Sequence, residues 1–333
     1  MDRFIVGTGR CGSTLLSRMI AEHPAVLSLF EYFNGQDFAA RFAPEPIEGE
    51  AFLALIADEQ PFVTAVLRRG YPVSEITYPF EAGGRYRRDQ ALPWVLVSTL
   101  PRLARDPDAL FDALCSWARS QPRRPALAHH RALFDWLAER LGRPCWVERS
   151  GSSFDYLGSL AANFPEARFL HIHRDGPETA LSMVHHHAYR LPISLLYRTP
   201  LEDGTPLSEL GPLDVNAPPS GDDAISKVLS SRPAPEHFGR YVSDQLLHGF
   251  RDLGRIDAAR YAEVRFEDLV ARPRETLARV GGFFELEAGE GWLERAARLV
   301  KGAPALRAPD LPEGRRRALD EACRPGQVLL GRA

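Results

Sequence analysis

Lysine is the most conspicuous shortage in this sequence. Of its 41 basic residues only Lys227 and Lys301 are lysines, and the others are arginines. The chain must therefore bind anions with guanidinium groups, which donate hydrogen bonds from a planar fork, rather than with ammonium groups. Net charge is small as well, because 44 acidic residues leave a formal value of −3. This balance excludes bulk attraction to nucleic acid or to an anionic membrane, so any recognition of phosphate has to be local.

Cysteine is scarce and long apolar runs are missing. Neither a metal knuckle nor a disulfide framework is expected, because the cysteines lie far apart without C-x-x-C spacing, and a reducing compartment fits. No stretch approaches the roughly 20 apolar residues of a membrane-spanning helix, and the N-terminal residues lack the pattern of a secretory leader. We expect a cytoplasmic protein without a membrane span. The four cysteines are Cys11, Cys115, Cys145 and Cys323.

Three segments repeat the order strand, turn and helix, at residues 3–24, 166–187 and 260–286. Such repetition is typical of a parallel sheet with helices on its faces. The length of 333 residues, with 44% hydrophobic residues, suffices for one large core that carries an insertion. The sequence therefore predicts a P-loop-like α/β fold of three layers, with a central parallel sheet flanked by helices, as a single domain over residues 1–333.

In the third segment the sequence also predicts where the strand and the helix begin and end. Residues 262–266 alternate between apolar and polar side chains, as in a half-buried strand. A helix is expected to begin near Pro273, since proline suits the first helical turn, and to end at the pair Gly281-Gly282.

Two stretches do not fit the repeating pattern. Residues 35–145 are mostly helical in pattern and are too long for one crossover, so we expect an inserted helical cap. Residues 199–235 are rich in proline, glycine, serine and aspartate. A loop of that length in a compact domain is usually a lid or a disordered segment, and we expect one of these here.

The segment GTGRCGSTLL at residues 7–16 follows the first expected strand and opens the first expected helix. It nearly matches the phosphate-binding loop G-x-x-x-x-G-K-[ST], with both glycines and the threonine in register but Ser13 in the lysine position. Successive backbone N–H groups and the positive end of the helix dipole favour an anion there. Without the lysine nothing obvious binds a γ-phosphate, although Arg10 can reach across the loop mouth. The alternative is a glycine-rich turn that only closes a βα unit.

A second pair of candidate residues is Arg174 and Ser182, eight positions apart in HRDGPETALS. Arg174 falls at the carboxyl end of a strand and Ser182 about two turns into the next helix. Ligands of open α/β sheets bind at that edge, and a guanidinium with a hydroxyl suits a phosphate. The alternative is a salt bridge from Arg174 to Asp175 or Glu178.

Together these residues resemble the sulfotransferases that use 3′-phosphoadenosine 5′-phosphosulfate (PAPS) as the sulfuryl donor. The resemblance rests on residues 7–16, 173–182 and 264–284 and covers about half of the chain. It implies that the first motif cradles the 5′-phosphosulfate and that Arg174 and Ser182 bind the 3′-phosphate. The donor-binding residues implied in the first motif are Gly9, Arg10, Cys11, Gly12, Ser13, Thr14 and Leu15.

Two features depart from the family pattern. The second arginine usual in the second motif is Glu178 here, and no clear C-terminal glycine-rich phosphate loop is present. Either Lys301-Gly302 or the run Arg315–Arg317 could take the place of that loop, and both alternatives stay open.

The resemblance also implies a general base, since an acceptor hydroxyl must lose its proton as it attacks. Branches of the family that act on carbohydrate or protein hydroxyls carry a glutamate shortly after an HP pair, and Glu31 matches that position. Arg10 stands where many relatives carry lysine, so it would stabilise charge that develops on the leaving group. The alternative for Glu31 is a loop carboxylate that faces solvent or is paired with an arginine.

Histidines invite a metal interpretation, which the spacing does not favour. His171 and His173 share one face of a strand and three more histidines occupy 185–187, but no carboxylate or cysteine is spaced to join them. We therefore expect no metal. One histidine of 185–187 is a candidate to line the acceptor pocket instead.

One further segment, WVERSGSSFDYL at 146–157, is similar to a W-x-E-K-[ST]-P segment of many bacterial relatives. This similarity would bring Glu148, Arg149 and Ser150 near the donor or the acceptor.

The preferred interpretation is a sulfotransferase that moves the sulfuryl group of PAPS in line to a hydroxyl of a small-molecule or carbohydrate acceptor and releases 3′-phosphoadenosine 5′-phosphate (PAP). A sulfuryl group carries less negative charge than a γ-phosphoryl group, which explains the dispensable lysine and magnesium. Two alternatives remain: a P-loop-like kinase or NTPase with a degenerate loop, and a non-catalytic nucleotide-binding protein. No nucleic-acid partner is expected, and the acceptor and the oligomeric state stay open.

Overall fold

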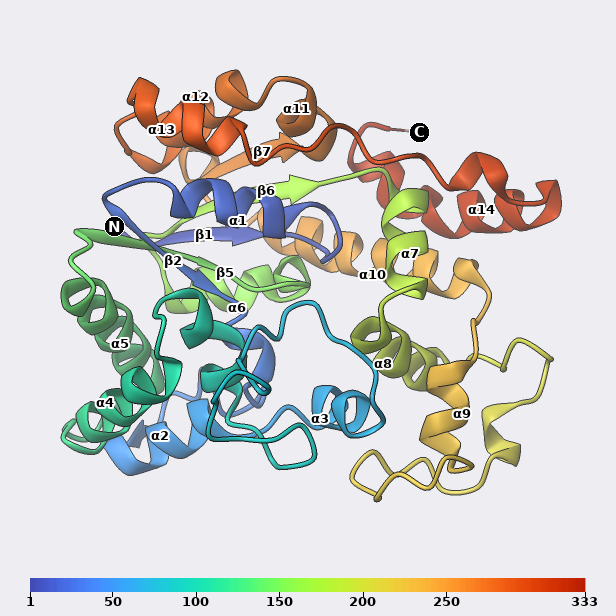
Figure 1. The fold of residues 1–333 in the computed structure, drawn as a ribbon. Coiled ribbons are helices and arrows are strands. Elements are labelled where there is room, and N and C mark those ends of the chain that lie inside the picture. The colour runs from blue at the N-terminus through green and yellow to red at the C-terminus, as the bar shows by residue number, and fades with distance from the viewer. Residues whose placement is uncertain (333) are drawn as a thin grey trace.

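The computed structural model describes residues 1–332. Within them, five parallel strands form a central sheet in the order β2-β5-β1-β6-β7 (Figure 1). All five carboxyl ends therefore meet at one edge, and the predicted α/β class with a central parallel sheet is confirmed. The strands are β1 (Arg3–Val6), β2 (Val26–Phe30), β5 (Cys145–Arg149), β6 (Arg168–His173) and β7 (Tyr261–Arg265).

Helices cover both faces of the sheet, as the three-layer prediction requires (Figure 1). Side chains of β1 alternate between the two cores: Phe4 and Val6 enter one cluster, and Ile5 enters the other. The smaller cluster lies under α1 (Ser13–Ala21), α11 (Phe266–Ala271), α12 (Pro273–Phe284) and α13 (Glu290–Ala297). The larger cluster lies under α5 (Ala126–Arg140), α6 (Leu157–Asn163), α7 (Gly176–Val184), α8 (His187–Tyr197), α10 (Pro235–Leu253) and α14 (Glu313–Leu329).

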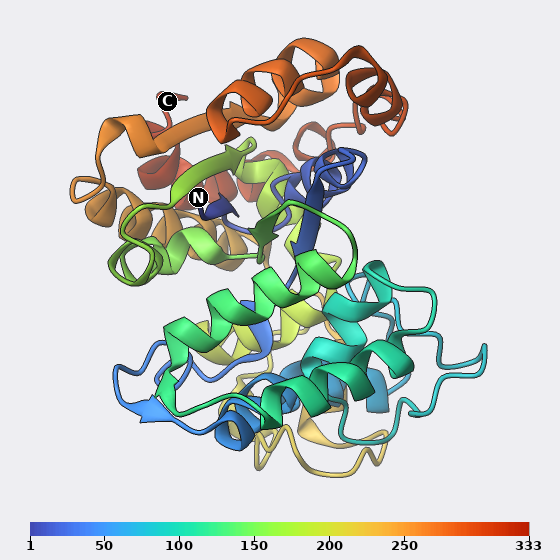
Figure 2. The same ribbon diagram turned by 90° about the vertical axis from the view of Figure 1, so that its left-hand side faces the viewer.

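The segment expected to form a helical cap, residues 35–145, lies on the side of the larger cluster (Figure 2). One of its helices, α5, packs directly on β5 and so belongs to the sheet's own helical layer. The segment 69–94 is irregular. The other α-helices and strands of the segment are α2 (Gly49–Ala57), α3 (Pro61–Arg68), α4 (Pro107–Arg119) and the antiparallel pair β3 (Pro46–Ile47) and β4 (Arg124–Pro125). A π-helix at Val95–Thr99 and a 3-10 helix at Leu100–Arg102 lie between α3 and α4.

Residues 199–235 run mostly without regular structure to the short helix α9 (Ala224–Ser230). A partly buried ion pair connects this segment to the insertion. Arg69, at the end of α3, lies 2.9 Å from Asp223 and also donates to Ser226 Oγ. The role of the segment as a lid stays a prediction.

Two expected boundaries in the third strand–helix unit were wrong. Phe266 was placed in the strand pattern, but β7 ends at Arg265 and Phe266 begins α11. The helix α12 passes through Gly281 and Gly282 and ends at Phe284. Glycine is found at 281 for packing, since a Cβ there would lie 3.2 Å from the Trp292 ring of α13.

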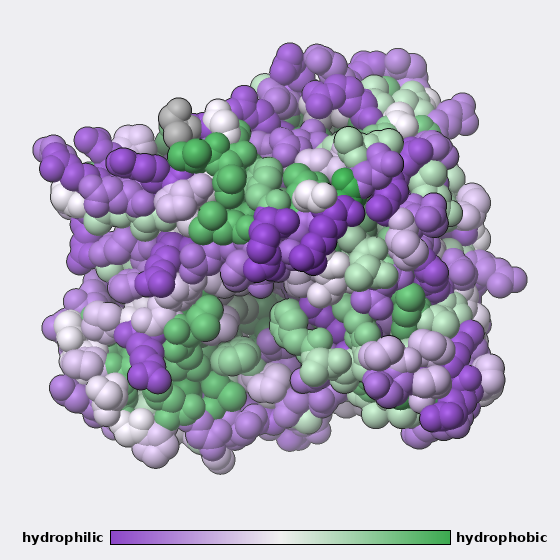
Figure 3. All heavy atoms as spheres, turned by 180° about the vertical axis from the view of Figure 1, so that it is seen from behind, coloured by the Kyte–Doolittle hydropathy of each residue, from purple (hydrophilic) through white to green (hydrophobic). Residues whose placement is uncertain are grey.

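The surface opposite to the view of Figure 1 is largely hydrophilic, with hydrophobic side chains gathered in separate patches (Figure 3). Within residues 1–332, none of the helices combines the length and the apolar character needed to cross a bilayer.

Candidate functional site

The loop after β1 has the backbone of an anion cradle. Gly9, Arg10 and Gly12 all have positive φ, at 77°, 53° and 95°, and Ser13 begins α1. Gly12 requires glycine, because a Cβ there would lie 2.1 Å from the Phe266 ring, and at Gly9 it would lie 1.9 Å from the Tyr189 hydroxyl oxygen. The turn therefore needs both glycines, and its backbone N–H groups lead into the positive end of α1.

Not every side chain of this loop reaches the cradle. Cys11 is fully buried and packs against Gly7, so only its backbone N–H group is suited to contact a ligand. Leu15 is half-buried and packs against the smaller core cluster. The hydroxyls of Ser13 and Thr14 both accept hydrogen bonds from Arg149 of β5.

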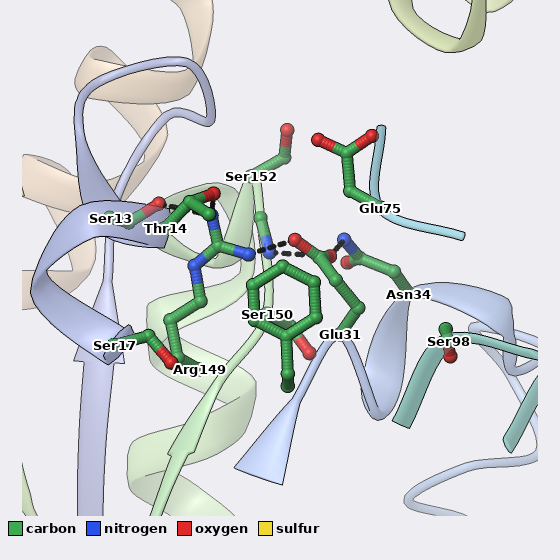
Figure 4. Close-up of polar contacts among 12 residues, drawn as sticks. Ser13, Thr14, Ser17, Glu31, Asn34, Glu75, Ser98, Arg149, Ser150 and Ser152 are labelled. Carbon is green, nitrogen blue, oxygen red and sulfur yellow. Dashed lines mark hydrogen bonds and ion pairs between the residues drawn. The ribbon is translucent and has the colours of Figure 1, made fainter. Parts of the chain in front are cut away.

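Arg149 is the central cation of the site (Figure 4). It is 3% exposed, and its Nη2 donates to Ser13 Oγ at 2.5 Å and to Thr14 Oγ1 at 2.9 Å. Its Nη1 donates to Glu31 Oε1. Burial, the largest single influence, would lower the pKa of Arg149, but the charge of Glu31 and smaller contributions from Tyr189, Cys11 and Glu75 together raise it. The positive charge missing from the loop's lysine position is thus supplied by a neighbouring strand.

Glu31 follows β2 directly and is 4% exposed. Its φ of 55° is left-handed, which turns its side chain toward Arg149. Its Oε2 accepts bonds from the Gly151 N–H, at 3.0 Å, and from Asn34. The alternative that Glu31 faces solvent is wrong, and the alternative that it pairs with an arginine is confirmed. A role as base stays a prediction.

Arg10 and Ser182 lie together although 172 residues separate them. Arg10 Nε donates to Ser182 Oγ at 3.2 Å, and Arg10 Nη1 lies 3.2 Å from Glu75 Oε1. Glu75 Oε2 in turn lies 2.8 Å from His186 Nε2. The loop after β1, α7 and the irregular part of the insertion therefore meet at one point.

Arg174 lies on the same edge and is connected to the loop through one ring. Its guanidinium carbon is 4.9 Å from the centre of the Phe266 ring, which also contacts Gly12. The alternative salt bridge is present as well, with Arg174 3.7 Å from Glu178. Arg174, Phe266 and Leu306 line a cavity of about 250 Å³.

The C-terminal segment left open by the sequence is found at this cavity. Gly302, not the run Arg315–Arg317, lines it. Glu178 anchors the segment, because its Oε1 accepts hydrogen bonds from the backbone N–H groups of Arg307, at 2.6 Å, and Ala308, at 2.9 Å. The residue that departs from the family pattern thus holds the C-terminal chain beside Arg174.

The strand histidine His171 is a packing residue. His171 stacks on Phe154 with ring centres 3.8 Å apart, and its Nδ1 lies 2.8 Å from the Tyr261 hydroxyl. Burial lowers its pKa well below the usual value. Among residues 1–332, no group of three or more His, Cys, Asp and Glu side chains is arranged to hold a metal ion. Of 185–187, His186 lines a second cavity of about 250 Å³ beside Glu31.

The similarity of residues 146–157 to a segment of bacterial relatives had suggested that Arg149 lies near the donor or the acceptor, and Arg149 does contact Ser13 and Thr14 of the loop. Its pairing with Glu31 and the position of Glu75 were not predicted. No signal in the sequence pointed to Glu75, because it lies in an irregular segment and only the tertiary structure brings it to Arg10.

The structure is similar to solved sulfotransferases, the family that the motifs resemble. No family model and no curated protein matches the sequence. The sulfotransferase domain from the curacin biosynthetic pathway is 13% identical with a TM-score of 0.49, and 96% of each chain is covered. Sulfotransferase STF9 from Mycobacterium avium is 16% identical with a TM-score of 0.47, over 99% of this chain and 75% of that one. STF1 from Mycobacterium tuberculosis H37Rv is 19% identical with a TM-score of 0.44, over 97% and 76%.

Replacing Arg149 is expected to destabilise the protein strongly. Arg149→Met leaves the buried Glu31 carboxylate without its counter-charge, which typically costs about 3–5 kcal/mol. Denaturant unfolding measures the loss. Exposed Arg279→Met is the matched control and should change stability by less than about 0.5 kcal/mol.

The double variant Arg149→Met with Glu31→Leu separates the loss of stability caused by the unpaired charge from the loss caused by changed packing. It removes both ions and should recover most of the stability, because an apolar pair of similar volume often replaces a buried ion pair without loss. If the double variant is no more stable than Arg149→Met, the ion pair does not explain the destabilisation.

The neighbouring Glu148 predicts a pH dependence of stability. It is 1% exposed and accepts a hydrogen bond from Ser150 Oγ at 2.5 Å. Burial, with a further contribution from the charge of Glu31, raises its pKa from 4.5 to about 8, against the opposing effect of Ser150. An acid with a raised folded-state pKa contributes stability that is complete below its unfolded pKa and is lost as pH rises toward the folded one.

We therefore expect Glu148→Gln to gain stability relative to the natural protein as pH rises from about 5 to 9, by on the order of 1–3 kcal/mol. Thermal unfolding across this range measures the difference. Exposed Glu139→Gln, on α5, should show a constant difference. A constant difference for Glu148→Gln as well would contradict the raised pKa.

Proposed function

We propose that this protein is a sulfotransferase that transfers the sulfuryl group of PAPS to a hydroxyl of a small-molecule or carbohydrate acceptor. The observation that carries the proposal is the position of Arg149, whose guanidinium lies against both hydroxyls that open α1. It supplies a fixed positive charge behind an anion-binding loop that lacks its own lysine. Guanidinium groups bind such anions through charge-assisted hydrogen bonds.

The described residues fit the two ends of such a donor. The loop from Gly9 to Thr14, with Arg10 at its mouth, is suited to hold the phosphosulfate. Ser182 and Arg174 are suited to hold the ribose 3′-phosphate. The cavity beside Arg174 offers the Phe266 ring and an apolar wall to a purine. Because Phe266 contacts both Gly12 and Arg174, one extended nucleotide can span the whole edge.

Glu31 is proposed as the base. Its Oε1 accepts one hydrogen bond from Arg149, and a carboxylate oxygen has a second lone pair that can take the proton of an acceptor hydroxyl. In the transfer, the acceptor oxygen forms a bond to sulfur while the bond from sulfur to the bridging oxygen of the donor breaks. Arg10 would stabilise the charge left on that phosphate.

A magnesium-dependent kinase or NTPase is disfavoured by the same arginine. In P-loop NTPases the serine or threonine after the lysine binds the magnesium ion. Here Thr14 occupies that position, and its Oγ1 lies 2.9 Å from Arg149 Nη2. A buried cation at this distance opposes a divalent metal by charge repulsion.

Selective stabilisation by PAP tests the donor site. At 100 times its Kd, a ligand that binds only the folded state adds about 2.7 kcal/mol of stability. We expect PAP to raise the melting temperature more than ATP, ADP or GDP, with no effect of magnesium. Magnesium-dependent stabilisation by ATP and none by PAP would favour the kinase alternative.

Glu31→Gln tests the base. Glutamine keeps the size and an acceptor oxygen for Arg149, whereas alanine would leave the arginine unpaired. Turnover with PAPS should fall by about 10²–10⁴-fold, while the Kd for PAP, measured below the melting transition, should change little. Parallel loss of turnover and PAP binding would assign Glu31 a structural role, and retained turnover would exclude it as the base.

A further inference from the structure

The cavity beside Glu31 has an aromatic wall. It has a volume of about 250 Å³, and most of its lining comes from the insertion, α8 and α10, with Glu31, Asn34, Ser152 and His186 completing it. Trp94 donates through Nε1 to the backbone oxygen of Glu31 at 2.6 Å, which fixes its ring there. The aromatic residues of the lining are Phe38, Phe62, Trp94, Tyr189 and Tyr241.

The charges in this cavity are unusual for so arginine-rich a chain. Among the described residues that line it, the charged side chains are Glu31 and Glu75, joined by His186, and neither arginine nor lysine is present. The cavity at Arg174 combines that arginine with Asp175, Glu178 and Glu267, and another cavity combines Arg18 and Arg102 with Glu22. The cavity beside Glu31 differs from both, because none of its described lining residues is an arginine or lysine that could bind an anionic ligand.

Glu75 is ionised, and its carboxylate is held by Arg10 and His186. Burial by itself would raise the pKa of Glu75, but the hydrogen bond and charge of His186, with the charges of Arg10 and Arg149, lower it to about 2. Glu75 lines the same cavity as Glu31, and Figure 4 shows its carboxylate directed away from Glu31. Its oxygens lie 3.2 Å from Arg10 Nη1 and 2.8 Å from His186 Nε2. When Arg10 turns to an anionic donor, one oxygen of Glu75 loses its cationic partner.

We infer that the acceptor is a small hydroxyl compound that carries a positive charge, such as an aromatic or aliphatic alcohol with an amino or quaternary ammonium group. Aromatic faces attract cations through their quadrupole. Once Arg10 has turned to the donor, the Glu75 carboxylate adds Coulomb attraction for a cation and repels an anionic acceptor, whereas Glu31 stays paired with Arg149. Glu75 is the specificity residue, because it would exchange Arg10 for the acceptor's cation. This inference rests on the proposed function and narrows its acceptor class.

Binding of three phenols of matched size tests the inference: tyramine, para-propylphenol and para-hydroxyphenylacetate, which end in an ammonium, a methyl and a carboxylate group. Each is titrated calorimetrically into the protein saturated with PAP. We expect tyramine to bind at least about tenfold more tightly than the neutral phenol, and the carboxylate most weakly. Equal or reversed affinities, or no binding of any of the three, would overturn the inference.

Two variants examine the recognising groups. Glu75→Gln should abolish the preference for tyramine over the neutral phenol, and Phe62→Leu, at a half-buried position, should reduce it without removing a charge. The ratio of the two affinities, for tyramine and for the neutral phenol, is measured within each variant. Any effect of the substitution on PAP binding therefore cancels. Exposed Glu81→Gln is the matched control and should leave the ratio unchanged. An unchanged ratio in Glu75→Gln would exclude Glu75 as the specificity residue.

The readouts separate this inference from the proposed function. If PAP stabilises the protein but the three phenols show no cationic preference, the acceptor class is wrong and the donor site stands. If PAP itself does not bind, the proposed function is wrong. A preference for tyramine measured without PAP would then show only that the cavity binds cations.

Discussion

The buried ion pair between Arg149 and Glu31 is the constraint on which the site depends. Two ions taken out of water are tolerated only when each has further partners, and here each has them. Arg149 also binds the hydroxyls of Ser13 and Thr14, and Glu31 also accepts from Gly151. The pair therefore joins β2, β5 and the start of α1 into one rigid unit, and a shift of any of these would leave a buried charge unpaired.

The rest of the edge is assembled around this unit by shared contacts. Phe266 touches Gly12 on one side and Arg174 on the other, and Arg10 joins Ser182 to Glu75. Arg10, Arg149 and Arg174 follow this edge, although Asp175, Glu178 and Glu267 also line the cavity at Arg174. The described lining of the cavity beyond Glu31 has carboxylates and aromatic rings but no arginine or lysine. The edge therefore offers guanidinium groups at the loop and at Arg174, and an aromatic wall beyond Glu31.

Much of the architecture could be predicted because its signals are local. The strand–turn–helix order of the first unit and the capping of α7 by Asp175, which accepts from the Glu178 N–H group at 3.0 Å, follow from short-range preferences. The end of α12 was misjudged because Gly281 serves contact with Trp292, a residue of another helix. From the sequence alone, a glycine that leaves space for a neighbouring side chain looks the same as a glycine that ends a helix. Only the structure shows which neighbour is present.

The sequence by itself determined the parallel α/β class, the glycine-rich turn between β1 and α1 and the residue types that gather at the carboxyl edge, because backbone propensity and hydrophobic periodicity act over a few residues. Only the tertiary structure decided which charges pair. Arg149 and Glu31 are 118 residues apart, and Glu178 meets Arg307 across 129. Burial selects such partners, because a charge removed from water is stable only next to an opposite charge. Which opposite charge lies close enough depends on how the whole chain packs.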